Sequence, residues 1–160
     1  MRFPGREGQG RLGESYEQAR QRFHQLERRL QEHPDLHQAY SEFMQEYEDL
    51  GHMNQINEDK SSAEERYYVP HHAVFKSSSS TTRTRVVFYG SCRSSNGLSL
   101  NDTLLVGPTI QKDLYPIVLQ FRIQQIAFTA DITTMYHQLR LHQDDRQLQR
   151  ILWRRSLRNH

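Results

Sequence analysis

The strongest constraint on the fold of this 160-residue chain is a pair of apolar stripes with helical spacing near its start. The first stripe repeats every three or four residues and consists of Leu12, Tyr16, Ala19, Phe23, Leu26 and Leu30. The second has the same period and consists of Leu36, Tyr40, Phe43, Tyr47 and Leu50. This spacing places the apolar side chains of each segment on one face of a helix. We therefore predict an antiparallel helical hairpin over residues 12–51.

The expected ends of the two helices rest on specific residues. Ser15 and Gln18 have the spacing of a capping box at the start of the first helix. Pro34 suits the first turn of the second helix, and Gly51 suits the position just after its end. The heptad-like spacing also fits a coiled coil, but each stripe is shorter than three heptads, which favours packing within the chain.

The second half of the chain alternates short strand-like runs with turns. Residues 67–76 and 84–90 are rich in aromatic and β-branched residues and predict a β-hairpin with a long serine-rich loop. Asn96-Gly97 is a strong turn signal. We expect a helix from Pro108, shortened or kinked by Pro116, with an apolar face made of Ile110, Leu114, Ile117, Val118 and Phe121. Further strands are expected at 126–130, 138–142 and 151–153.

These elements indicate an α+β fold with a small antiparallel sheet. Residues 1–11 contain glycines and a proline without apolar periodicity, which is typical of a disordered leader, and residues 52–66 form a polar linker between the helical hairpin and residues 67–160. Only 35% of the residues are hydrophobic and the mean hydropathy is −0.89, which indicates a modest core.

Composition also bounds the compartment and the partners. The single cysteine, Cys92, excludes a disulfide framework, and no apolar run is long enough to span a membrane, so we expect a soluble intracellular protein with no membrane partner. The sequence leaves open whether it is cytoplasmic, in a virus-like particle, or nuclear.

The charge is distributed unevenly along the chain. Residues 1–70 hold 9 Lys/Arg and 14 Asp/Glu, a charge of −5, whereas residues 71–160 hold 12 Lys/Arg and 5 Asp/Glu, a charge of +7. The second half can therefore attract nucleic acid, although a solvated basic surface has the same composition.

One acidic residue stands out in the second half. Asp131 follows the apolar run 126–130, which would place its carboxylate at the end of a strand. An aspartate there could simply cap the following turn. However, Tyr136 follows five residues later, and Gln138 to His142 then alternate between polar and apolar residues. Composition alone favours the capping role, and the case for a functional site depends on what the whole segment resembles.

The segment TADITTMYHQLRLH resembles the first catalytic-aspartate motif of reverse transcriptases, and more narrowly that of the BEL/Pao class of LTR retrotransposons. The resemblance extends from Leu12 to Arg154 through LGESYEQARQRFHQLERRL, YYVPHHAVFK, TRTRVVFYGSCRSSNGLSLND, LLVGPTIQKDL and DDRQLQRILWR. It implies the start of a reverse transcriptase: a helical N-terminal extension, the fingers and the first part of the palm. It also implies RNA-directed DNA polymerisation, with a template-primer of RNA or DNA, a dNTP and the remainder of the Pol polyprotein as partners.

The resemblance assigns roles to individual residues. Asp131 corresponds to the first catalytic carboxylate and, with the backbone carbonyl of Ile132, to ligands of Mg²⁺, a cation that prefers oxygen ligands. Tyr136 corresponds to the residue that lies under the nucleotide sugar and excludes a 2′-hydroxyl group. Arg85 corresponds to a residue that binds the triphosphate, for which a guanidinium group is well suited. Lys76 and Arg83 are weaker candidates for contacts with phosphate or template.

The chain also departs from the family pattern. The second acidic motif, an aromatic residue followed by x-Asp-Asp, does not occur before His160, and Asp144-Asp145 lies in a polar turn without the flanking apolar strands. Tyr89 and Gly90 follow Phe88 where the family usually has an acidic residue. We therefore expect this chain to be a catalytically incomplete fragment that binds Mg²⁺ weakly at most. The alternatives are a non-catalytic nucleic-acid-binding or assembly module derived from a retroelement, and a degenerate copy without function.

Overall fold

The computed structural model of the chain describes residues 12–56, 66–75, 84–109, 111–133 and 135–155. The predicted leader, most of the predicted polar linker and the serine-rich loop lie outside these residues. The chain divides into two units, of which the first combines Met1–Leu104 with Leu141–His160 and the second is Leu105–Arg140. We call the first the packed unit and the second the inserted unit, and each is described by itself.

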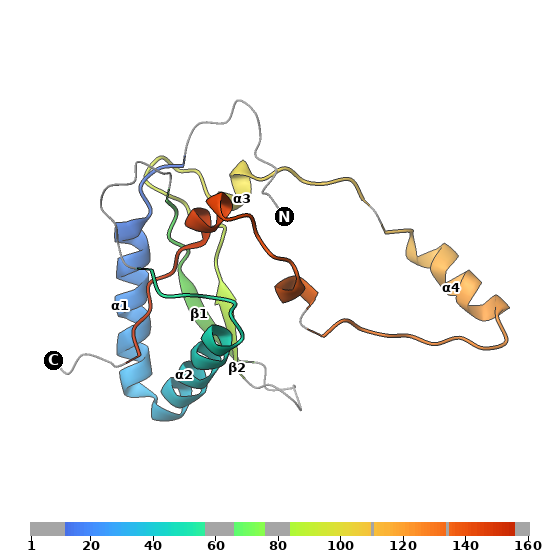
Figure 1. Ribbon diagram of the computed structural model, residues 1–160, viewed down its shortest axis with the longest axis horizontal. Coiled ribbons are helices and arrows are strands. Elements are labelled where there is room, and N and C mark those ends of the chain that lie inside the picture. Colours follow the sequence, from blue (N-terminus) through green and yellow to red (C-terminus); the bar gives the residue numbers. More distant parts are fainter. Residues whose placement is uncertain (1–11, 57–65, 76–83, 110, 134, 156–160) are drawn as a thin grey trace. The chain divides into compact units, whose positions relative to one another are not determined.

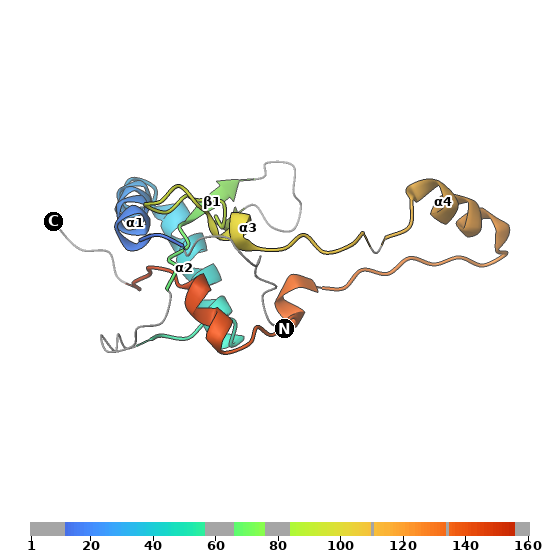
Figure 2. The same ribbon diagram turned by 90° about the horizontal axis from the view of Figure 1, so that it is seen from above.

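The two predicted helices are present in the packed unit. Helix α1 is Tyr16–Glu32 and helix α2 is Pro34–Asp49, and the chain reverses direction between them at His33 (Figures 1 and 2). Pro34 occupies the first turn of α2, where its missing N–H group costs no helical hydrogen bond. Gly51 follows the end of α2 with a φ of +73°, a conformation that glycine adopts without strain. The helical hairpin predicted from the two apolar stripes is therefore confirmed.

The core between the helices follows the predicted stripes in part, since Tyr16 of the first stripe is 36% exposed and Phe43 and Tyr47 of the second are half-buried. The buried side chains are Phe23, Leu26 and Leu30 of α1, Leu36, Tyr40 and Met44 of α2, and Ala73 of the sheet. Leu50 was expected on the buried face but is 61% exposed, because it lies beyond the last turn of α2. Met44 was not in the predicted stripe but is fully buried. The predicted capping box is also wrong, because the Ser15 hydroxyl accepts a hydrogen bond from the Tyr68 N–H group instead of capping α1.

The predicted β-hairpin is also present. Strand β1 is His71–Phe75 and strand β2 is Thr84–Phe88, and they pair antiparallel with His71 opposite Phe88 and Phe75 opposite Thr84. His71 and Ala73 are buried on the side that packs against the helical hairpin. Val74 and Val87 point to the opposite face and are 42% and 38% exposed. One face of this two-stranded sheet thus belongs to the core and the other is open to solvent.

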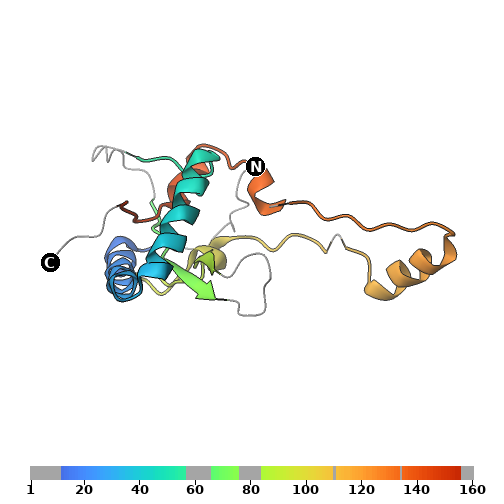
Figure 3. The same ribbon diagram turned by 90° about the horizontal axis from the view of Figure 1, so that it is seen from below.

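The segment after the inserted unit returns to the packed unit and runs past α1 and β1 (Figures 1 and 3). It begins with a short 3-10 helix, η2, at Asp144–Gln149. Arg150 then forms an isolated parallel bridge with Tyr68, with hydrogen bonds of 3.0 Å to the Tyr67 carbonyl and 2.7 Å from the Val69 N–H group. The strand expected at 151–153 is not formed as part of a sheet, although these residues pack against both hydrophobic clusters.

Two local features connect β2 to the inserted unit. Gly97 has a φ of +84° and its N–H group donates to the Ser94 carbonyl over 2.9 Å, as expected for the Asn96-Gly97 turn. Helix α3, Leu100–Thr103, was not predicted. It starts at a capping box in which Ser99 and Asp102 each bind the backbone N–H group of the other. The buried side chain of Leu100 joins Tyr67 and Val69 in a second cluster.

The inserted unit differs most from the prediction. Its helix α4 is Leu114–Ile123, so Pro108 does not open it, and Pro116 lies in its first turn where proline is tolerated. The apolar side chains of α4 are exposed and face no sheet. No strand forms at 126–130 or 138–142, and the only regular element near Asp131 is the 3-10 helix η1, Met135–Gln138. A strand needs a hydrogen-bonding neighbour, and none of the described residues pairs with these two segments.

The packed unit and the inserted unit together give an α+β chain whose sheet consists of β1 and β2 over the described ranges. Within those ranges, no helix combines the length and the apolar character that a membrane span requires.

Candidate functional site

The β-hairpin presents Arg85 on its open face. Arg85 pairs in register with Val74, and His72 pairs with Val87 on the same face. The side chain of Arg85 is exposed, as are its apolar neighbours Val74 and Val87. The opposite face of the hairpin is buried against α1 and α2, so the core holds the strand that carries the guanidinium group. This arrangement leaves Arg85 accessible to an anionic ligand.

The predicted catalytic residues lie in the inserted unit and are exposed. Asp131 is in an irregular segment, and the following Ile132 is 61% exposed. Tyr136 lies in η1 with 80% of its surface exposed, so its ring is not part of a core. The Gln138 side chain donates a hydrogen bond of 3.4 Å to the Thr133 carbonyl, which links η1 to a residue just after Asp131.

The structure does not assemble the predicted site residues within either unit. Arg85 belongs to the packed unit, whereas Asp131, Ile132 and Tyr136 belong to the inserted unit. The other two predicted contacts with phosphate or template, Lys76 and Arg83, lie outside the described residues. The described residues of the predicted site are therefore divided between the two units, with Arg85 in one and Asp131, Ile132 and Tyr136 in the other.

The residues described around Asp131 supply only part of a magnesium shell. Mg²⁺ needs an octahedral shell of oxygen ligands, usually with more than one carboxylate in a two-metal polymerase site. Among the residues that the structure describes, no group of three or more His, Cys, Asp or Glu side chains could hold a metal ion. One carboxylate and one backbone carbonyl supply two of these ligands, and Mg²⁺ in proteins usually completes its shell with water and substrate phosphates.

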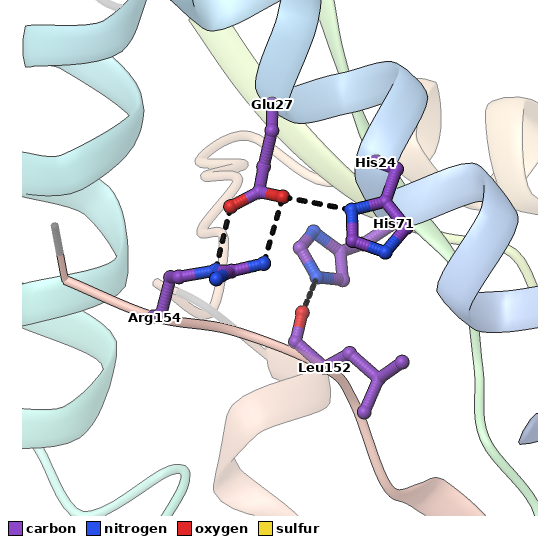
Figure 4. A network of polar contacts seen from close by, with 5 residues as sticks. All are labelled: His24, Glu27, His71, Leu152 and Arg154. Carbon is purple, nitrogen blue, oxygen red and sulfur yellow. Dashed lines mark hydrogen bonds and ion pairs between the residues drawn. The ribbon is translucent and has the colours of Figure 1, made fainter. Parts of the chain in front are cut away.

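A polar cluster that was not predicted from the sequence lies where the C-terminal segment crosses the core (Figure 4). The Arg154 guanidinium group forms a bidentate ion pair with Glu27, with distances of 2.6 and 2.9 Å from its Nε and Nη2 atoms. The His24 ring contacts the same carboxylate at 3.1 Å. Glu27 is only 8% exposed, and Arg154 also covers the Phe23 ring at 5.3 Å. The cluster joins α1 to the C-terminal segment.

The imidazole of His71 also holds the C-terminal segment, through hydrogen bonds at both of its ring nitrogens. Its Nε2 atom lies 2.8 Å from the Leu152 carbonyl oxygen, which can only accept, so Nε2 carries the proton (Figure 4). Its Nδ1 atom is then free to accept the hydrogen bond that the Tyr40 hydroxyl donates. Burial lowers the pKa of His71, and the hydrogen bond to the Leu152 carbonyl offsets only part of this lowering. Burial also raises the pKa of Tyr40. Both groups are thus neutral near pH 7 and hold the C-terminal segment by hydrogen bonds.

One sequence signal for this cluster was available. Glu27 lies between Leu26 and Leu30 on α1, four residues after the buried Phe23, which places a carboxylate on the edge of the apolar face. A charge at such a position needs a partner, and the arginines near residue 154 could have supplied it. The partner of His71 left no such signal, because Leu152 contributes a backbone carbonyl.

No family model, curated protein or solved structure matches this chain.

Proposed function

We propose that this chain is the first part of a reverse transcriptase of the BEL/Pao type, comprising its helical extension, its fingers and the start of its palm. The observation that carries the proposal is the order and spacing of its motifs, from the β-hairpin segment TRTRVVFYG to the aspartate segment TADITTMYHQLRLH. The activity of the complete enzyme would be RNA-directed DNA polymerisation. Its partners would be a template-primer, dNTPs and the remainder of the Pol polyprotein.

The geometry of the β-hairpin supports the role proposed for Arg85. A residue that binds a triphosphate must be accessible to solvent and must also be held on a rigid element. Arg85 meets both requirements, because it is exposed while the other face of its hairpin is buried in the core. Its planar guanidinium group can donate two parallel hydrogen bonds to phosphate oxygens.

The exposure of Asp131 and Tyr136 supports the roles proposed for them in a larger assembly. Neither side chain is buried in the inserted unit, so both are available to a ligand or to further protein. The adjacent apolar residues Ile126 and Phe128 are 86% and 87% exposed, which is costly for side chains of this type. We propose that the remaining palm covers these apolar residues and holds the Asp131 loop in its working conformation.

In the complete enzyme, Mg²⁺ would stabilise charge on the attacking and leaving oxygens of the phosphoryl transfer. In this chain, Asp131 and the Ile132 carbonyl would contribute two of its ligands, Arg85 would orient the triphosphate, and Tyr136 would lie under the sugar. Since no aromatic-x-Asp-Asp motif occurs before His160, we propose that the 160-residue chain alone does not catalyse the reaction.

A second function is favoured by the charge distribution. The charge of +7 on residues 71–160 and the absence of an assembled carboxylate site among the described residues fit a non-catalytic nucleic-acid-binding module. Such a module would bind RNA or DNA without regard to Asp131. The two functions therefore differ in whether nucleotide incorporation can be restored to the chain.

The decisive experiment is primer extension by a fusion of residues 12–155 to the downstream palm of a BEL/Pao reverse transcriptase. We expect template-directed incorporation of dNTPs with Mg²⁺ by the fusion and none by the chain alone with Mg²⁺ or Mn²⁺. Asp131→Asn should abolish the incorporation, because an amide is a neutral and weaker ligand for a hard cation. Asp144→Asn is the matched control, since it removes an exposed carboxylate to which we assign no catalytic role.

The nucleotide-binding role has its own comparison in the same fusion. Arg85→Gln should raise the KM for dNTP, whereas Arg93→Gln removes an exposed arginine outside the hairpin and should leave it unchanged. Incorporation that survives Asp131→Asn would refute the polymerase proposal. A soluble fusion that binds template-primer normally but never extends it would favour the non-catalytic module.

A further inference from the structure

Residues 150–155 form an anchored segment that we call the strap. Its backbone is tied to Tyr67 and Val69 through Arg150, its side chains Arg154 and Arg155 form ion pairs with Glu27 and Glu48, and its Leu152 carbonyl accepts from His71. Along the chain, the strap comes after η2, and η2 is held separately by the hydrogen bond of 3.0 Å from the Tyr67 N–H group to the Gln147 carbonyl. The strap is thus the last described segment of the chain and is held by contacts of its own.

The hydrogen bonds around His71 depend on one protonation state. The Leu152 carbonyl requires a proton on Nε2, and the Tyr40 hydroxyl can donate to Nδ1 only while that atom keeps its lone pair. Protonation of Nδ1 would place two donors against each other and would put a charge in a site where His71 is 5% exposed and Tyr40 is 0% exposed. The closed arrangement is thus specific to the neutral imidazole.

The surroundings of His71 offer little compensation for a positive charge. Phe23, Phe88 and Trp153 surround its ring, with centroids 6.2, 6.1 and 6.2 Å away. Figure 4 draws Glu27 and His24 of α1 and Arg154 of the strap beside His71. The Tyr40 hydroxyl of α2 is bound to its Nδ1 atom, His72 of β1 adds a small lowering of its pKa, and β2 contributes Phe88. Glu27 is the only carboxylate among them, and it is already paired with Arg154 and His24 (Figure 4).

We propose that His71 is a proton-sensitive latch, which holds the strap against the helical hairpin and the β-hairpin while its imidazole is neutral and releases it on protonation. Release exposes His71 to water and removes the contacts of Trp153 with Tyr40 and Phe23, whose ring centroids lie 5.5 and 6.4 Å away. The hydrogen bond from the Tyr67 N–H group to the Gln147 carbonyl and the packing of α1 against α2 do not involve His71 and are kept. The device is independent of the function proposed for Asp131.

The pH dependence follows from the direction of the pKa shift. Burial lowers the pKa of His71 in the closed state, whereas the open state has the ordinary histidine pKa of about 6.5. Above about pH 6.5 neither state binds the proton and the latch is fully effective. As the pH falls below that value the open state binds the proton first, so closure weakens until the pH reaches the lowered pKa. From pH 7.5 to 5 the ratio of open to closed strap should rise by up to about 30-fold.

The test uses Trp153, the only tryptophan of the chain, as a reporter within the strap. In the full chain, acidification from pH 7.5 to 5 should shift the Trp153 emission to longer wavelength and raise its quenching by acrylamide, with far-UV circular dichroism unchanged. His71→Gln keeps an amide donor for the Leu152 carbonyl but cannot titrate, so this transition should disappear. His24→Gln and His72→Gln are the controls, and both should keep it.

Tyr40→Phe tests the same latch if His71→Gln fails to fold. Removing the hydroxyl group takes away a hydrogen bond specific to the neutral imidazole, so the midpoint of the transition should move up by about 0.5–1 pH unit. A transition that persists in His71→Gln, or that disappears in Glu27→Gln while the midpoint stays fixed in Tyr40→Phe, would overturn the proposal. Loss of the helical signal together with the change at Trp153 would also overturn it, since the strap would then not open separately.

Discussion

Replacing Phe23 with alanine tests whether the strap and the helical hairpin form one core. The Phe23 ring is 8% exposed and lies in the core cluster of α1 and α2. It also contacts the rings of His71 and Trp153, and the Arg154 guanidinium group covers it. One side chain thus joins α1, β1 and the strap, and its removal should weaken all three contacts.

The magnitude follows from burial and from these contacts. Replacing a buried phenylalanine with alanine costs about 3–5 kcal/mol. The contacts with Trp153 and Arg154 add to the cost, but the position of Phe23 at the edge of the core allows neighbouring side chains to fill part of the space. We expect a loss of about 3–4 kcal/mol in the free energy of unfolding. With a urea m-value of about 1.5 kcal/mol/M, the unfolding midpoint should fall by about 2 M.

The assay is equilibrium unfolding in urea followed by Trp153 fluorescence, which reports on the packed unit. Phe128→Ala is the matched control, because it deletes the same atoms from a side chain that is 87% exposed in the inserted unit. It should change the stability by less than about 0.5 kcal/mol. If Phe23→Ala prevents folding altogether, Phe23→Leu should give a smaller loss of about 1–2 kcal/mol.

Two results would refute this reasoning. A midpoint for Phe23→Ala within about 0.3 M of the unsubstituted chain, at an unchanged m-value, would show that the α1 face is not packed as described. An equal loss for Phe128→Ala would show that the inserted unit is buried in solution.

Three further predictions concern the ion pairs, the charge and the sugar. Glu27→Gln should lower the free energy of unfolding in urea by about 1–2 kcal/mol, because it leaves the half-buried Arg154 without its anion. Glu48→Gln, in the more exposed pair with Arg155, should lower it by less than about 0.5 kcal/mol. Equal losses would contradict the difference in burial. Binding of the chain to single-stranded RNA or DNA should weaken steeply between about 50 and 200 mM salt in a fluorescence-anisotropy titration, and a dissociation constant independent of salt would exclude binding through the basic half. In the active fusion, Tyr136→Val should raise ribonucleotide incorporation about 10- to 100-fold, because a 2′-hydroxyl group would no longer be desolvated against the ring. Unchanged discrimination between dNTP and rNTP would leave Tyr136 without a role in selecting the sugar.

The local sequence determined the elements whose stabilising contacts are near in the chain. The period of the apolar residues predicted both α1 and α2, and Pro34 and Gly51 marked the limits of α2. The Asn96-Gly97 pair predicted the turn at Gly97. The β-branched runs predicted the β-hairpin, because its two strands are each other's hydrogen-bonding partners. The motifs also selected Asp131, Arg85 and Tyr136 as candidate site residues, and those roles stay predictions.

Tertiary structure decided whatever depends on residues distant in the chain. The Ser15 hydroxyl binds Tyr68 rather than its own helix. His71 can be buried because the Leu152 carbonyl and Tyr40 satisfy both of its ring nitrogens. The same dependence explains the errors in the inserted unit. An apolar run such as 126–130 becomes a strand only beside a neighbouring strand, and local sequence cannot show whether the rest of the fold supplies one.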